Sequence, residues 1–171
     1  YMKDKWIDSL DPYQGGGSMI KNVETYESTY LDGFEKFEAG TPPIAEVIGL
    51  SASLSFINEV GIDSIYSHEN ELTNYAYEKM KRFNDMKLYG DFNNQTSIIS
   101  FNLDGVHFND LAMFLDKKNI AIRTGHHCAQ PLMKHFKISG SARMSLGVYN
   151  TKEDVDYFVQ SINEVNTIFK S

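Results

Sequence analysis

The residues best suited to chemistry in this 171-residue sequence lie in one run, Arg123-Thr124-Gly125-His126-His127-Cys128-Ala129-Gln130-Pro131. Cys128 is the only cysteine, so it has no disulfide partner within the chain. A thiol is a useful nucleophile as its thiolate, which nearby positive charge and helix N-termini favour. An arginine and two histidines precede Cys128, and Pro131 suits the first turn of a helix. The run predicts a nucleophilic cysteine in a cationic loop ahead of a helix.

Two other interpretations compete with this prediction for Cys128. A single cysteine is often a buried, unreactive residue that packs like a small apolar side chain. The residues on both sides are too polar for a core strand, so we expect Cys128 on the surface or in a cleft. His126, His127, Cys128 and His135 are also possible metal ligands. Three adjacent ligands do not readily surround one zinc ion, and no second pair at zinc-finger spacing occurs, so we expect no metal site.

Composition restricts the class of protein. The chain has a net charge of −7 and no basic run, which argues against a nucleic-acid surface. Hydrophobic residues make up 42% of it, as in globular proteins, and no apolar stretch approaches the length of a membrane span. One cysteine without a disulfide framework fits a reducing, cytoplasmic setting. With 171 residues, we expect one domain together with part of another.

Hydrophobic periodicity and capping residues predict a small α/β layer. Thr41 suits an N-cap and Pro42 the first helical position of a helix that ends before Gly61. Asn150-Thr151, followed by Asp154, predicts a capping-box start for the last helix. The other expected elements are strand and loop at 19–37, helices at 69–87 and 109–119, and strands at 96–103, 120–122 and 142–146. This order predicts a short, mainly antiparallel sheet covered by helices.

Two glycine-containing segments each allow two interpretations. Gly15-Gly16-Gly17 lets the backbone approach another chain or a ligand closely, or forms a flexible loop. Its spacing matches neither the Walker nor the Rossmann pattern. Gly40-Thr41 is an ordinary helix cap or an anion site, since helix N-termini favour negative charge. The residues alone leave both questions open.

Several motifs together resemble one family. The run 123–131 is similar to the nucleophile loop of group II, or Suf-type, cysteine desulfurases and of the related selenocysteine lyases. Residues 12–20 resemble their glycine-rich segment, and residues 37–42 resemble the segment before their long interdomain helix. Residues 142–146 and 149–154 resemble their closing strand and helix. Because these matches run in order along nearly the whole chain, it is identified as a C-terminal portion of a member of this family.

The resemblance implies a fold and a reaction. The fold is that of type I pyridoxal-phosphate-dependent transferases, in their class V aminotransferase branch. Residues 1–40 are expected to be the end of the large cofactor domain, and residues 41–171 the small C-terminal domain. The thiolate of Cys128 is expected to attack the sulfur of L-cysteine, which leaves L-alanine and an enzyme persulfide for iron–sulfur cluster assembly. The expected partners are a small sulfur-acceptor protein and a second subunit in a homodimer.

The matching motifs also imply roles for individual residues. Arg143 matches the arginine that binds the substrate carboxylate, and Arg123 lines the same site; a planar guanidinium suits this task. Gly40 and Thr41 match a segment that reaches the cofactor phosphate of the partner subunit. His126 and His127 flank the nucleophile, where they tune its charge, move a proton or only shape the loop.

The family's pyridoxal-phosphate lysine lies in the large domain, upstream of the motifs found in this sequence. None of the lysines present has the matching context, so we expect the chain alone to be inactive. A selenocysteine lyase is the alternative enzyme. A metal-binding domain and a silent interaction domain are further alternatives from other functional classes.

Overall fold

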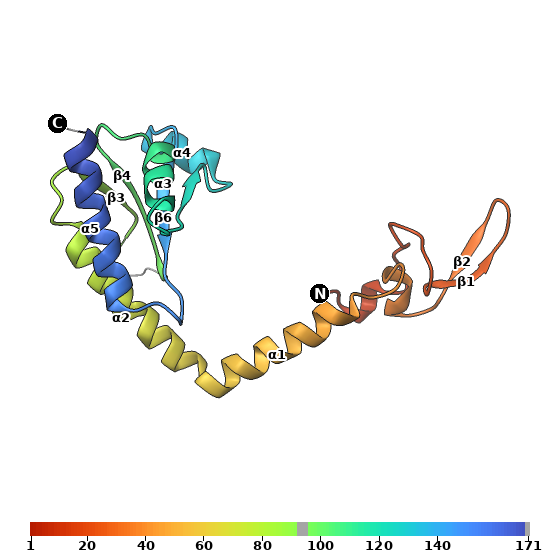
Figure 1. Cartoon of the computed structure of the whole chain (residues 1–171). Coiled ribbons are helices and arrows are strands. Elements are labelled where there is room, and N and C mark those ends of the chain that lie inside the picture. The colour runs from red at the N-terminus through yellow and green to blue at the C-terminus, as the bar shows by residue number, and fades with distance from the viewer. Residues whose placement is uncertain (92–95, 170–171) are drawn as a thin grey trace. The chain divides into compact units, whose positions relative to one another are not determined.

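A computed structural model describes residues 1–91 and 96–169 of the chain. The chain divides into two compact units, residues 1–59 and residues 60–171 (Figure 1). The division falls near the end of a long helix. The predicted domain boundary between residues 40 and 41 rests on the family resemblance and stays a prediction.

The first unit has few buried side chains. It contains two 3-10 helices, η1 (Asp4–Trp6) and η2 (Phe34–Phe37), and an antiparallel pair of strands, β1 (Ile20–Val23) and β2 (Ser28–Tyr30). The strand and loop predicted at 19–37 are therefore confirmed for residues 19–33, whereas residues 34–37 form the 3-10 helix η2. Met19 is the one buried hydrophobic residue of this unit. With so little apolar surface removed from water, the unit gains little stability by itself.

The two glycine-containing segments of the first unit lie against each other. The Gly40 amide donates a 2.8 Å hydrogen bond to the carbonyl of Gly17. A Cβ added to Gly16 would lie 3.1 Å from both the Ala39 Cβ and the Gly40 nitrogen, closer than side chains normally pack. The glycine run therefore lies close to residues 39–40 of its own chain, while its predicted approach to another chain or a ligand stays a prediction.

The long helix α1 spans Ile44–Val60 and begins later than predicted. Pro42 lies outside the helix because it is followed by Pro43, and a residue before a proline disfavours the α conformation. Thr41 therefore does not cap the helix. The Pro43 carbonyl instead accepts a helical hydrogen bond of 3.0 Å. The predicted end is confirmed, with Gly61 at φ +87° directly after the last helical residue.

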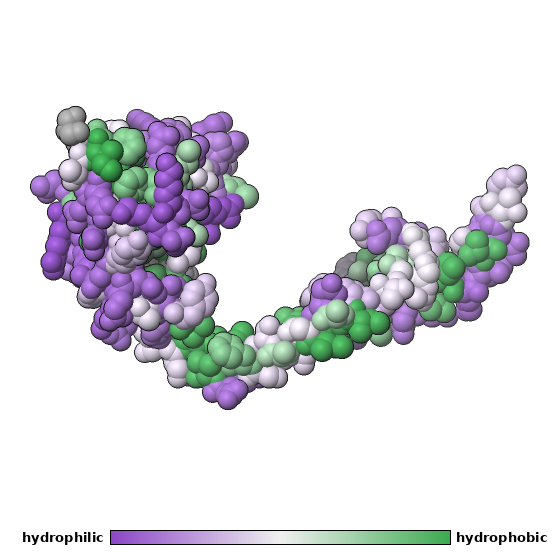
Figure 2. Space-filling model, in the orientation of Figure 1, coloured by the Kyte–Doolittle hydropathy of each residue, from purple (hydrophilic) through white to green (hydrophobic). Residues whose placement is uncertain are grey.

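Apolar side chains are exposed along α1 (Figure 2). A helix that is apolar on all sides normally lies inside a larger structure. The exposed apolar residues of α1 include Ile44, Val47, Ile48, Leu50, Leu54 and Phe56. In the part of the chain that the structure describes, no single helix is long and apolar enough to cross a membrane. Helix α1 and the helix that follows it are long and apolar enough only when they are taken together, and Gly61 separates them.

The second unit is built on a four-stranded antiparallel sheet (Figure 1). Its strands lie in the order β3 (Met86–Tyr89), β4 (Ile98–Leu103), β6 (Ser141–Ser145) and β5 (Arg123–Gly125). Its helices are α2 (Ile62–Met80), α3 (Phe108–Asp116), α4 (Gln130–Phe136) and α5 (Lys152–Phe169). The predicted short, mainly antiparallel sheet covered by helices is confirmed.

Alternation along the central strands separates the two faces of this sheet. Ile99, Phe101 and Leu103 of β4 are buried in the main core. The helical part of that core comes from α2, α3 and α5: Leu72, Ala76, Met80, Leu111, Leu115, Val155, Phe158, Ile162 and Val165. Ser100 of β4 and its register partner Arg143 of β6 face the other way, toward α4. The core thus fixes which side chains β6 presents to α4.

Two helices show how well the sequence predicts boundaries. The helix predicted at 69–87 is α2, which starts and ends seven residues earlier, and the strand β3 follows it. The apolar stripe of α2 continues through Phe83 in the turn, so periodicity does not mark the helix end. The capping box of α5 is confirmed: the Thr151 amide donates to the Asp154 carboxylate at 2.9 Å, and the Asp154 amide donates to the Thr151 hydroxyl at 3.3 Å.

Two other predictions need correction. The strand predicted at 120–122 lies three residues later, as β5, because its pairing with β6 begins at Arg123. Helix α3 is capped by His107, whose Nδ1 accepts the Asn109 amide at 3.3 Å, so Asn109 lies inside the helix. A histidine is not among the residues that usually signal a helix start.

Candidate active site

Two adjacent strands place the two predicted arginines directly opposite each other. Arg123 of β5 and Arg143 of β6 are register partners, so both side chains leave the same face of the sheet. Like charges in opposing positions destabilise a sheet unless something compensates them. The pair is therefore a suitable place for an anion such as a carboxylate, which a guanidinium binds with paired hydrogen bonds.

The nucleophile loop has an unusual backbone. His127 and Cys128 are consecutive residues in the left-handed region, with φ of +54° and +59°. For residues other than glycine this conformation costs about 1 kcal/mol or more each, so surrounding contacts must hold it. The Ala129 amide closes the turn with a 2.9 Å hydrogen bond to the His126 carbonyl. The left-handed pair turns the chain sharply from β5 into α4, as the sequence predicted for a loop ahead of a helix.

The side chain of His127 anchors this turn to β6. Its Nε2 lies 3.0 Å from both the carbonyl oxygen and the hydroxyl oxygen of Ser141. A carbonyl only accepts, which assigns the imidazole proton to Nε2. Ser141 is 1% exposed, so the anchor is held inside the unit. Ser141 carries no signal for this role in the sequence, because no local motif marks a serine as the partner of a residue fourteen positions away.

Arg123 contacts the thiol itself. One of its terminal nitrogens donates to the Cys128 sulfur at 3.5 Å. Cys128 is exposed, as predicted, and lies two residues before α4. An open hollow of about 530 Å³ surrounds it, lined by Arg123, Thr124, His126, His127, Cys128, Gln130 and Pro131. A thiolate at this position has a cationic hydrogen-bond donor and free access from solvent, which are the requirements of a reactive cysteine.

Two polar atoms behind the loop are buried without a partner among the described residues: His127 Nδ1 and Arg143 Nε. Both residues line a cavity of about 380 Å³ between α4 and the sheet. Apolar side chains form most of its wall, including Leu132, Met133, Phe136 and Ile138. An unpaired donor on Arg143 is costly unless an acceptor binds there. This observation again favours an anion beside Arg143.

Burial lowers the pKa of His127 below the ordinary imidazole value. The positive charges of Arg143, Arg123 and His126 lower it further, while the hydrogen bond to the Ser141 backbone acts in the opposite direction. His127 is therefore neutral at pH 7, with Nε2 as donor to Ser141 and Nδ1 as a bare acceptor. His126 is exposed and has a weaker contact, 3.4 Å from its Nδ1 to the Gln130 side chain.

The predicted cofactor residues Gly40 and Thr41 belong to the first unit. Gly40 is half-buried and Thr41 is exposed. Because α1 begins at Ile44, the Thr41 hydroxyl is not used as a helix cap. Across residues 1–91 and 96–169, no group of three His, Cys, Asp or Glu side chains is arranged to hold a metal ion.

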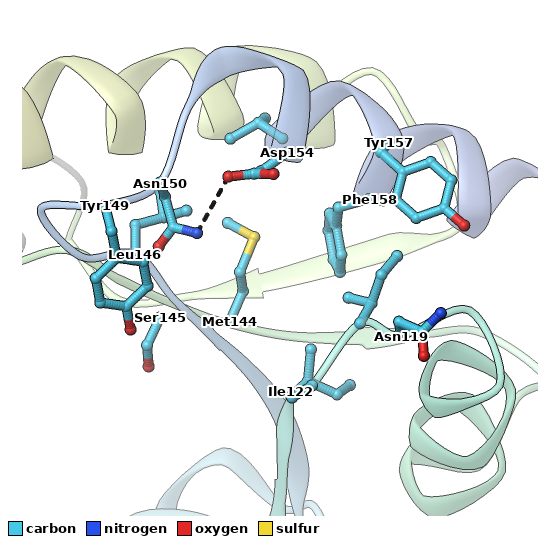
Figure 3. A pocket seen from close by; sticks show the side chains of 13 residues that line it. Asn119, Ile122, Met144, Ser145, Leu146, Tyr149, Asn150, Asp154, Tyr157 and Phe158 are labelled. Carbon is cyan, nitrogen blue, oxygen red and sulfur yellow. Dashed lines mark hydrogen bonds between the residues drawn. The ribbon is translucent and has the colours of Figure 1, made fainter.

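A separate hollow of about 300 Å³ lies between α5 and the segment that leads into β5 (Figure 3). Met144, Phe158 and Ile122 form its floor, and Tyr149 and Asn119 lie at its edges. None of the residues predicted for chemistry lines it. The candidate active site is therefore the loop between β5 and α4, with the neighbouring part of β6.

This chain belongs to the class-V aminotransferase family, whose family model matches residues 1–158. It is similar to probable cysteine desulfurases of Staphylococcus epidermidis, 44% identical over 170 residues, and of Staphylococcus aureus, 42% identical over 168 residues. These alignments cover 99% and 98% of this chain and 41% of each relative. The chain thus spans about two fifths of the length of the curated relatives it matches.

Solved structures give the same result. The cysteine desulfurase CsdA from Escherichia coli is 33% identical with a TM-score of 0.89, and covers 99% of this chain and 42% of its own. A cysteine desulfurase from Thermococcus onnurineus is 34% identical with a TM-score of 0.88, covering 96% and 42%. The cystine C-S lyase C-DES, 17% identical with a TM-score of 0.72 over 94% and 40%, shares the fold. The predicted resemblance to cysteine desulfurases of the class-V aminotransferase family and the predicted fold class are confirmed.

Proposed function

We propose that this chain is the C-terminal part of a cysteine desulfurase and that Cys128 receives the sulfur of L-cysteine. One observation carries the proposal: the Arg123 guanidinium contacts the Cys128 sulfur at 3.5 Å and lies opposite Arg143 in the sheet. A nucleophilic thiol and a pair of carboxylate-binding groups therefore share one site. An amino acid with sulfur on its side chain presents a carboxylate and a sulfur atom to complementary groups.

The residues present fit part of the surroundings of pyridoxal phosphate. Arg143 would offer its unpartnered Nε to the carboxylate of the amino acid that the cofactor holds, and Thr41 would offer its hydroxyl to the phosphate of the partner subunit's cofactor. When bound, pyridoxal phosphate withdraws electrons from the amino acid and so weakens its carbon–sulfur bond. The lysine that would hold it covalently is proposed to lie outside this chain.

The residues of this chain supply the sulfur-accepting half of the reaction. The Cys128 thiolate attacks the substrate sulfur, so that a sulfur–sulfur bond forms while the carbon–sulfur bond breaks. The electron pair of the broken bond stays with carbon, which takes a proton and leaves as L-alanine. Arg123 stabilises the thiolate before attack, and the His127–Ser141 contact holds the loop in place.

We further propose a Suf-type enzyme, since the nucleophile follows Arg123 by five residues and sits in a structured turn. In this proposal the enzyme is a cytoplasmic homodimer, in which Gly40 and Thr41 serve the cofactor of the partner subunit. The persulfide passes to a small acceptor protein, and the sulfur is used in iron–sulfur cluster assembly. These finer points rest on the family resemblance.

The deciding experiment uses the full-length protein with L-cysteine. We expect alanine to form, one extra sulfur atom on the peptide that contains Cys128, and both products to be lost in Cys128→Ala. Alanine formation from selenocysteine or cysteine without dependence on Cys128 would identify a selenocysteine lyase instead. No alanine from a protein with bound pyridoxal phosphate would refute the activity.

The chain by itself is expected to release no alanine from cysteine, because the lysine is missing. Borohydride reduction of the chain with stoichiometric pyridoxal phosphate, followed by peptide mapping, tests this expectation. A reduced lysine adduct at one defined position would overturn it. Scattered, substoichiometric labelling agrees with it, since exposed lysines react with aldehydes without a site.

A further inference from the structure

Charge is unevenly distributed along this chain. The stretch 117–152 contains seven lysines and arginines and no aspartate or glutamate, whereas the whole chain has a net charge of −7. The other 135 residues hold only nine of the 16 cationic residues and all 23 acidic ones. The candidate nucleophile Cys128 lies inside the one strongly cationic stretch. A protein that is acidic elsewhere therefore concentrates positive charge in the stretch of sequence that contains its candidate nucleophile.

Part of this positive charge is already compensated. Lys118 pairs with Glu164 of α5, and Lys152 pairs with Glu71 of α2 at 2.5 Å. Among the described residues, no ion pair is formed by Arg123, Lys134 or Lys137. All three are exposed and lie on the nucleophile loop, on α4 or directly after α4. Within the stretch, the exposed cations without an ion pair among the described residues are thus Lys117, directly after α3, and the three on the nucleophile loop, on α4 or directly after α4.

Two histidines also lie in this stretch. His126 in the loop and His135 on α4 are both exposed. The acidic residues nearest in sequence, Asp116 and Glu153, lie outside the stretch. Leu132, 47% exposed on the same short helix, gives an apolar contact amid the charges. Cations around a central apolar contact are typical of a surface that binds a protein of opposite charge.

We propose that Arg123, Lys134 and Lys137, the cationic surface, dock the acidic face of the protein that removes sulfur from Cys128. The inference rests on the proposed function and deepens it by stating the chemistry of the acceptor. Opposite charges accelerate encounter by long-range attraction and exclude partners of the wrong sign. The acceptor thiol then attacks the outer sulfur of the persulfide: a new sulfur–sulfur bond forms, the old one breaks, and Cys128 leaves as thiolate.

The test uses full-length enzyme and two synthetic acceptor peptides of equal length. Each has one central cysteine, flanked in one peptide by four glutamates and in the other by four lysines. After one turnover with L-cysteine, mass spectrometry follows sulfur transfer to each peptide. At low salt we expect transfer to the acidic peptide to be about tenfold faster. In 1 M salt, where charges are screened within about 3 Å, the two rates should converge.

Matched variants distinguish an effect of the cationic surface from an effect of the protein's net charge. Lys134→Glu combined with Lys137→Glu should reverse the preference, whereas Lys81→Glu combined with Arg82→Glu, at the end of α2, should retain it. Alanine formation with dithiothreitol as the acceptor should be equal in all three proteins. Equal rates for the two peptides at low salt would overturn the inference. So would an unchanged preference in the Lys134 and Lys137 variant.

A second readout does not need desulfurase activity. Iodoacetate is anionic and iodoacetamide is neutral, and both alkylate a free thiol. The ratio of their rates at Cys128 should fall several-fold in the Lys134→Glu, Lys137→Glu protein and stay constant in the α2 control. If no alanine forms with dithiothreitol, the proposed function fails, while this ratio still decides whether the surface attracts anions. An unchanged ratio rejects the surface itself.

Discussion

Truncation of His127 to alanine tests whether its ring holds the nucleophile loop. The imidazole Nε2 is 3.0 Å from two oxygens of Ser141, which is 1% exposed. These contacts hold two consecutive left-handed residues, His127 and Cys128. An alanine at position 127 cannot make either contact, so the turn loses this attachment to β6. The turn should therefore open more often.

The expected increase in opening of the turn follows from the lost hydrogen bond. A buried intramolecular hydrogen bond contributes about 1 kcal/mol, so its loss raises the open population of the turn about fivefold. The left-handed cost of residue 127, about 1 kcal/mol, remains in the alanine variant but is absent in His127→Gly. The glycine variant should therefore open less than the alanine variant. The difference in opening between the two variants measures the cost of the backbone conformation separately from the loss of the anchoring hydrogen bond.

Hydrogen exchange of the Ala129 amide provides the assay. That amide closes the turn through its 2.9 Å bond to the His126 carbonyl, so its exchange reports local opening. We expect about fivefold faster exchange in full-length His127→Ala and little change in His126→Ala, whose ring is exposed. Exchange within twofold of the parent in His127→Ala would refute the anchoring role. Equal acceleration in both variants would show a general effect of loop mutation.

Three further predictions concern the second unit. Because burial lowers the pKa of His127, this residue takes up a proton in the unfolded chain at a higher pH than in the folded protein. The free energy of unfolding should therefore decrease as the pH falls below about 6.5. Urea unfolding between pH 5 and 7 measures this decrease, which should be smaller in His127→Gln. Gly140→Ala should destabilise the fold by about 1–3 kcal/mol, since the new Cβ would lie 2.7 Å from the Phe108 ring, and Phe108→Leu should partly restore stability to urea. Thr151→Ala removes half of the capping box of α5 and should lower the free energy of unfolding by about 1 kcal/mol in urea unfolding. The control Thr167→Ala, at an exposed position of the same helix, should lower it by less.

Local patterns predicted much of the secondary structure. The alternation at 96–103 and the capping box at Thr151 describe interactions between residues near in sequence, so the sequence contains all the information required. The start of α1 was predicted two residues too early. The rule that a proline disfavours helix at the residue before it, applied to Pro42, would have corrected it. The end of α2 depends on where β3 pairs with β4, which no local pattern records.

The sequence by itself predicted which residues of this protein do chemistry: the cationic run around Cys128 and the arginine on the strand that follows. Residue type and order were enough for this prediction, because it rests on local motifs and on family likeness. Only the tertiary structure decided that Arg123 lies opposite Arg143 and that Ser141 holds His127. Those relations depend on the register of β5 against β6, and register is set by the burial of Ala142 and Met144 in a core made by distant helices.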